Sequence, residues 1–148
     1  MPEEIDPPAD NTGTDIPVVY SKTVIDHATK PRNMGPIEQP DGYATITGPC
    51  GDTMQIWFRV RDDLIIAATF MTDGCGPSIA SGSIATELVK RKAAADAIRI
   101  SHKDILNALD GLPEDSRHCA LLAANTIKAA IRDYIAFKSE PWKRAYVK

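Results

Sequence analysis

The chain has 148 residues, with 17 basic and 20 acidic side chains and a formal net charge of −3. This length is typical of one folded domain, and the near balance of charge argues against a general nucleic-acid surface and gives no support for binding to an anionic membrane. No stretch is long and apolar enough to span a bilayer, and the acidic start lacks the features of a secretory signal, so we expect a soluble, cytoplasmic protein.

Residues 1–18 hold four prolines among mostly polar side chains, a composition with too little apolar surface to offset the entropy cost of ordering. We expect a flexible arm there, a folded domain over residues 19–138 and a tail over residues 139–148. Ser21 is a typical helix N-cap residue and Pro31 is a residue that ends helices, so a short helix is predicted between them.

Alternating apolar residues predict β-strands in the next part of the chain. The period of two covers residues 43–47 and residues 54–61, which predicts two strands with one buried face each. Asp62-Asp63 favours a hairpin turn before a third strand over residues 64–72. Because these connections are short, the strands are expected to pair in an antiparallel sheet.

Helical spacing of apolar residues follows Cys75 and continues to the basic run at residues 90–92. Ser101 and Asp104 have the spacing of a capping box and predict another short helix. A stripe of apolar side chains predicts a final helix over residues 114–137. The sequence thus predicts an α+β fold with a small three-stranded antiparallel sheet, helices packed on one face and a long C-terminal helix.

The three cysteines each lie where a thiolate is well suited to bind a metal. Cys50 is in a glycine-flanked turn, with Asp52 two residues further on. Cys75 precedes a predicted helix, whose unpaired N–H groups and positive dipole end favour a thiolate. His118 and Cys119 lie near the start of the last helix. An odd number of cysteines in a reducing compartment favours free thiols or metal ligands over disulfides.

Each of these residues also has an ordinary structural interpretation. A single free cysteine often packs as a small apolar residue, and an aspartate next to glycine often supports its own turn. A Cys–His hydrolase would use His118 to activate Cys119, but this interpretation leaves the other two cysteines without a role. The joint occurrence of three thiols, one carboxylate and one imidazole favours a metal or sulfur site instead.

On these residues the chain resembles the IscU/NifU-type iron–sulfur cluster assembly scaffold proteins, over residues 20–138. The matching segments are Tyr20-Ser21-Lys22-Thr23-Val24-Ile25-Asp26-His27, Pro31-Arg32-Asn33, Cys50-Gly51-Asp52, Gly74-Cys75-Gly76 with Ile79-Ala80-Ser81, and His118-Cys119. The resemblance implies an assembly scaffold rather than an enzyme, which accepts persulfide sulfur and iron, builds a transient 2Fe-2S cluster and transfers it to apo-proteins. A zinc-dependent persulfide sulfurtransferase is the alternative.

The resemblance also implies roles and partners. Cys50, Cys75 and Cys119 would hold the cluster, Asp52 and His118 would complete or destabilise the coordination, and Cys119 would accept the persulfide. Iron is the metal expected, with zinc in the cluster-free site. The implied partners are a cysteine desulfurase, an iron donor or frataxin-like protein, apo iron–sulfur acceptor proteins and a second copy of the chain in a homodimer.

Cys119 is the thiol expected to accept sulfur, because a helix start beside His118 and Arg117 favours an accessible thiol of low pKa. The chain departs from many family members at Leu112-Pro113-Glu114-Asp115-Ser116, where they carry Leu-Pro-Pro-Val-Lys. The resemblance therefore does not extend to recognition by an Hsp70-type chaperone. The zinc-dependent branch carries an insertion between its second and third cysteines, and the interval between Cys75 and Cys119 is too short to contain it. That branch also typically lacks a histidine at the position of His118. Both differences favour the scaffold interpretation.

Overall fold

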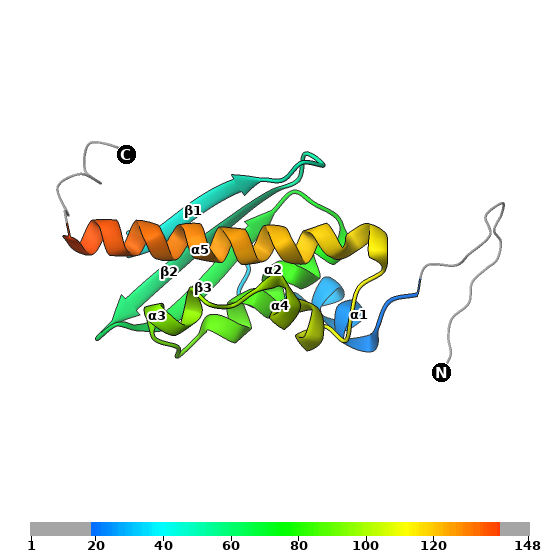
Figure 1. Ribbon diagram of the computed structural model, residues 1–148, viewed down its shortest axis with the longest axis horizontal. Coiled ribbons are helices and arrows are strands. Elements are labelled where there is room, and N and C mark those ends of the chain that lie inside the picture. Colours follow the sequence, from blue (N-terminus) through cyan, green and yellow to red (C-terminus); the bar gives the residue numbers. More distant parts are fainter. Residues whose placement is uncertain (1–18, 140–148) are drawn as a thin grey trace.

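Figure 1 shows the computed structural model of the chain, which describes residues 19–139. A three-stranded antiparallel sheet contains β1 (Gly42–Thr47), β2 (Thr53–Arg61) and β3 (Leu64–Thr72) in that order. The predicted sheet is therefore confirmed. The expected arm and tail lie outside the described residues, apart from Ser139, which is the last residue of the C-terminal helix.

The sheet has one buried face, as the alternation in the sequence predicts. Met54, Ile56 and Phe58 of β2 are fully buried, and the residues between them are partly exposed. The turn between β2 and β3 is formed by Asp62 and Asp63, which have φ values of 54° and 62°. Positive φ at both central residues is the requirement of a tight hairpin turn whose twist matches the strands. One irregularity that the sequence analysis does not predict is the register shift between Arg59 and Val60.

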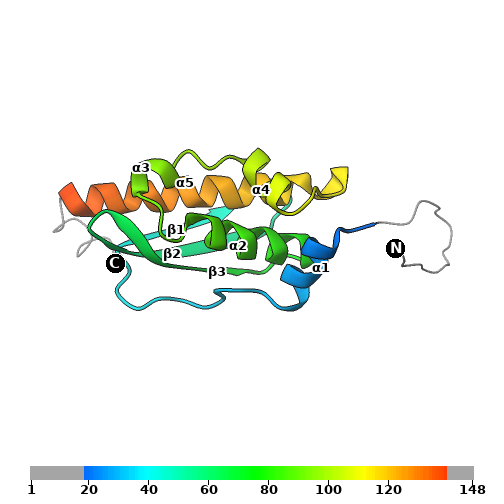
Figure 2. The same cartoon turned by 90° about the horizontal axis from the view of Figure 1, so that it is seen from below.

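Helices cover the buried face of the sheet (Figure 2). The long helix α5 (Arg117–Ser139) packs against β1 and β2, and α2 (Gly76–Val89) packs against β3 and α5. The other helices are α1 (Lys22–Thr29), α3 (Ala94–Ala97), α4 (His102–Ala108) and the 3₁₀ helix η2 (Glu114–Ser116). Within residues 19–139, no helix combines the length and the apolar character that a membrane span requires.

The start of α2 is held in place by close packing along the helix. Most of its residues are buried, and α1, β3, α4 and α5 all contact it. Gly82 lies directly against Phe70 of β3, where a Cβ atom would overlap the phenylalanine ring. Glycine therefore allows α2 to approach the sheet closely. This contact packs α2, the helix whose N-cap residue is Cys75, against β3.

His27 joins α1 to α2 in the interior. Its side chain is 7% exposed, and its Nδ1 atom lies 2.7 Å from the hydroxyl oxygen of Ser83 on α2. Burial lowers the pKa of His27, and the charge of Arg32 lowers it further, while Asp26 and Glu87 act in the opposite direction. The folded protein thus favours the neutral imidazole at this position.

We expect stability to fall on acidification because of His27. Below about pH 6.5 the unfolded chain protonates this imidazole while the folded protein resists protonation, so stability declines until the lower folded pKa is reached. Chemical denaturation at about pH 7.5 and about pH 5.5 measures the loss, which is at most about 1.4 kcal/mol per pH unit for one group. His27→Asn should reduce this pH dependence, and His102→Asn is the control. An unchanged pH dependence in His27→Asn would contradict the expectation.

Candidate metal site

Three segments that are far apart in the sequence meet at one end of the sheet (Figure 1). They are the loop between β1 and β2, the loop between β3 and α2, and the first turn of α5. Asp73 joins the first two, because its carboxylate accepts a hydrogen bond from the backbone N–H of Thr53 at 2.8 Å. The fold therefore brings Cys50, Cys75 and Cys119 to the same end of the molecule.

The β1–β2 loop is a tight turn. The N–H of Gly48 donates to the carbonyl of Asp52 at 2.8 Å, and the N–H of Gly51 donates to the carbonyl of Gly48 at 3.0 Å. Gly51 has a φ of 95°, which is costly for other residues. The turn leaves the thiol of Cys50 exposed and the side chain of Asp52 partly buried.

Cys75 is the N-cap residue of α2 and is exposed. Its side chain makes no capping hydrogen bond, while its carbonyl accepts the N–H of Ile79 at 3.0 Å. Pro77 follows in the first turn, where a missing backbone N–H costs nothing. The expected position of Cys75 at the start of a helix is confirmed.

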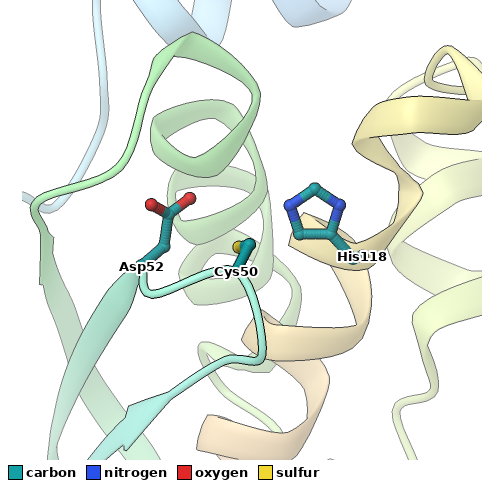
Figure 3. Close-up of side chains that lie close together, drawn as sticks. All are labelled: Cys50, Asp52 and His118. Carbon is teal, nitrogen blue, oxygen red and sulfur yellow. The ribbon is translucent and has the colours of Figure 1, made fainter.

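Cys50, Asp52 and His118 form a candidate metal-binding group, whose side chains lie close together (Figure 3). Among residues 19–139 this is the set of candidate ligands whose donor atoms all lie within 4.8 Å of one another. Ligand atoms around one tetrahedral zinc ion are roughly 3.2–3.8 Å apart. A movement of at most about 1.5 Å would therefore allow all three side chains to bind one ion.

Cys75 and Cys119 do not belong to that group in this conformation, although both lie nearby. The sulfur of Cys119 is 3.7 Å from Nε2 of His118. Besides burial, which is the main cause of the raised pKa of Cys119, Cys75, Asp52 and Cys50 are close enough to raise it electrostatically. Of the five predicted ligands, the structure thus brings Cys50, Asp52 and His118 into one group. Cys75 and Cys119 lie next to this group.

The expectation that Cys119 is an accessible thiol of low pKa is wrong for this conformation. The side chain is 1% exposed, and burial is the main reason why the pKa of Cys119 is raised. The hydrogen bond with Ser78 acts in the opposite direction, and the electrostatic effect of Cys75 adds to that of burial. The physical reason is the orientation of Cys119 on α5. It lies on the same helix face as the buried residues Ala123 and Thr126, so its thiol points into the core.

Ser78 also lies at the site, a position that no motif in the sequence predicts. It is fully buried on the first turn of α2, and its Oγ atom lies 3.2 Å from Oδ2 of Asp52 and 3.3 Å from Sγ of Cys119. The signal in the sequence is its spacing: Ser78 is three residues after Cys75, which places both on the same side of the helix. Ser78 thus connects the β1–β2 loop to α5.

Comparisons with known proteins give a consistent family. The model of the NifU-like N terminal domain matches residues 19–140. The iron–sulfur cluster assembly scaffold protein IscU 1 of Archaeoglobus fulgidus is 44% identical over 78% of this chain and 76% of its own length. IscU of Escherichia coli strain K12 is 44% identical over 79% of this chain and 94% of its own length.

A solved structure has the same fold. It is the N-terminal part of a nitrogen-fixing NifU-like protein from Brucella abortus, which superimposes with a TM-score of 0.62. The match covers 78% of this chain and 93% of that chain, at 22% sequence identity. At this low identity, the similarity supports the fold and not a particular activity.

Proposed function

This chain belongs to the family of NifU-like N-terminal domains, and from that premise we propose that it is a scaffold for building a transient 2Fe-2S cluster. The observation that carries the proposal is the convergence of Cys50, Asp52 and His118 within 4.8 Å, with the thiol of Cys119 beside them. The names of two relatives at 44% identity support the same function.

The proposed ligand set suits a cluster that must leave again. Iron and sulfide are held most firmly by cysteine thiolates. A carboxylate such as Asp52 is a harder ligand that suits iron in a cluster less well. We propose that Cys50, Cys75 and Cys119 hold the cluster, while Asp52 and His118 complete a coordination that is easily broken. The cluster is then cargo of the protein and not a resident cofactor.

We propose that Cys119 accepts the sulfur. In this step the Cys119 thiolate attacks the outer sulfur of a persulfide on a cysteine desulfurase. A new S–S bond forms at Cys119, the S–S bond of the donor breaks, and the donor cysteine leaves as a thiolate. Because Cys119 is buried, its thiol has to move outward before this attack.

The proposal includes the partners that such chemistry requires. A desulfurase supplies sulfur, an iron donor or frataxin-like protein supplies iron, and apo-proteins receive the cluster. A second copy of the chain is proposed as a further partner in a cluster-bound homodimer. The cytoplasm is the proposed compartment, since its reducing conditions keep thiols free. In this account the protein is an assembly platform and not a turnover enzyme.

A second candidate function is a zinc-dependent persulfide sulfurtransferase. The mixed group of one thiol, one carboxylate and one imidazole supports it, because zinc accepts all three donor types in a tetrahedral site. In that case zinc would occupy the site while a cysteine relays sulfur, and no cluster would form.

Anaerobic reconstitution distinguishes the two functions. The full chain is mixed with a cysteine desulfurase, cysteine, ferrous iron and a reductant that supplies electrons for converting persulfide sulfur to sulfide. The scaffold function predicts the visible absorption and circular dichroism of a 2Fe-2S cluster, and omission of the desulfurase should prevent its formation. Zinc retention with persulfide formation, but without any cluster, would contradict the scaffold function and support the sulfurtransferase.

A further inference from the structure

Ser78 occupies a central position in the site without being one of its proposed ligands. Its hydroxyl lies between the carboxylate of Asp52 and the thiol of Cys119, at 3.2 Å and 3.3 Å. These two partners come from different segments, the β1–β2 loop and α5. One buried hydroxyl group thus links the exposed side of the site to its buried cysteine.

The donor and acceptor roles in this bridge follow from the chemistry of the three groups. An ionised carboxylate only accepts hydrogen bonds, and a serine hydroxyl has one proton to donate and two lone pairs. Ser78 therefore donates its proton to Asp52, and a lone pair of its oxygen remains for the S–H group of Cys119. In this arrangement the hydroxyl holds the cysteine in its inward position.

The bridge is enclosed by the β3–α2 loop. A Cβ atom on Gly74 would overlap the side chain of Ser78 and lie 2.9 Å from Oδ2 of Asp52. The backbone N–H of Gly74 is itself held by the hydroxyl of Thr72 at 3.1 Å. The loop thus packs against the Asp52–Ser78 contact with only a hydrogen atom at the Cα position facing it. The Asp52–Ser78 hydrogen bond is consequently partly buried and the Ser78–Cys119 contact is buried, and removal from water strengthens such bonds.

We propose that Ser78 is a positioning residue that keeps Cys119 buried, and that opening of the Asp52–Ser78–Cys119 bridge presents the thiol to its sulfur donor. Only the role of this opening in sulfur transfer rests on the proposed function. The restraint on Cys119 is a property of the free protein. Ser78 does not contact the sulfur that is transferred. It acts through the position of Cys119 and is anchored by Asp52.

Thiol labelling of the metal-free protein tests the restraint. The protein is treated with iodoacetamide, and peptide mass spectrometry follows the rate of alkylation at each cysteine separately. Ser78→Ala should accelerate labelling of Cys119 by about fivefold, the factor that corresponds to the net strength of one intramolecular hydrogen bond. Labelling of Cys50 and Cys75 should change much less, because both thiols are already exposed.

Ser81→Ala provides a matched control. Ser81 is a second fully buried serine on α2, and among the described residues its hydroxyl oxygen has no hydrogen-bond partner. The same substitution there should leave the labelling of Cys119 unchanged. Equal acceleration in Ser81→Ala and Ser78→Ala would overturn the proposal, because loosening of α2 would then explain both. An unchanged Cys119 rate in Ser78→Ala would also overturn it.

A double substitution tests the anchor. If Ser78 acts through the bridge, Asp52→Ala alone should also accelerate labelling of Cys119, and adding Ser78→Ala to it should have little further effect. If the accelerations of Cys119 labelling in the two single variants multiply in the double variant, Ser78 and Asp52 act independently and the proposed bridge is wrong. Because no desulfurase or iron is present in these experiments, failure of cluster assembly would leave the result on Ser78 standing. The two proposals can therefore fail separately.

Discussion

Replacing Cys119 with serine is expected to reduce persulfide acceptance from a cysteine desulfurase to background. A serine hydroxyl is a weak nucleophile without an activating base and cannot take over the attack on the donor persulfide. The measurement is mass-spectrometric detection of one added sulfur atom after incubation with the desulfurase and cysteine. Serine is close in size to cysteine, so the substitution should leave the buried position at the start of α5 filled.

The other two cysteines provide the controls. Cys75→Ser should keep the added sulfur on Cys119, because Cys75 lies at the start of a different helix and is not required for the attack. Cys50→Ser should do the same. Full persulfide formation in Cys119→Ser, together with its loss in Cys50→Ser or Cys75→Ser, would move the acceptor to one of the exposed thiols.

Replacing Asp52 with alanine is expected to slow the release of an assembled cluster by about tenfold or more. In the proposed ligand set the carboxylate is the ligand that leaves most readily, and its removal would leave the cluster on thiolates and an imidazole. Without Asp52, the hydroxyl of Ser78 would also lose its acceptor, and by the proposal above it would no longer hold Cys119 away from the ligand set. A tenfold change corresponds to about 1.4 kcal/mol, which is near the contribution of one hydrogen bond to a charged group.

The rate of release is measured by mixing the loaded protein with an iron chelator and following the visible absorption. Asp52→Asn is the matched variant, because it keeps an oxygen donor of similar size without the charge, and it should fall between the parent protein and Asp52→Ala. Faster release in Asp52→Ala would mean that Asp52 stabilises the cluster.

Local patterns were sufficient to predict most of the fold. The Ser21 cap and the capping box of Ser101 and Asp104 both form. The strands follow the period of two, and the Asp62-Asp63 turn adopts the positive φ values that it requires. These elements depend on near neighbours in the sequence, which explains why a single sequence predicts them.

Elements without a strong local signal were missed or displaced. The four-residue helix α3 has no side-chain cap, since its N-cap residue is Ala93, and the sequence patterns do not predict it. The final helix was predicted to begin near Glu114, but η2 occupies residues 114–116 and α5 begins at Arg117. Helix ends often contain such a 3₁₀ turn, which periodicity alone does not separate from an α-helix.

The local structure around the predicted ligands is easier to predict than the exposure of their side chains. The turn that carries Cys50 and the helix starts that carry Cys75 and His118 form as the sequence predicts. The burial of Cys119 depends on which side of α5 faces the core, and the apolar stripe beginning at Ala120 covers the neighbouring positions. The contact with Ser78 depends on the approach of α2 to α5, which is tertiary packing. A local pattern contains no information about that approach.

Transfer of a cluster to an apo-ferredoxin is the decisive measurement for the proposed scaffold function. The protein is loaded anaerobically, separated from free iron and sulfide, and mixed with the acceptor while visible circular dichroism follows both proteins. The account predicts that the signal of the loaded scaffold disappears as the signal of the ferredoxin appears. A protein that holds zinc tightly and gains no cluster, or one that retains its cluster in the presence of the acceptor, would contradict the assignment as a scaffold.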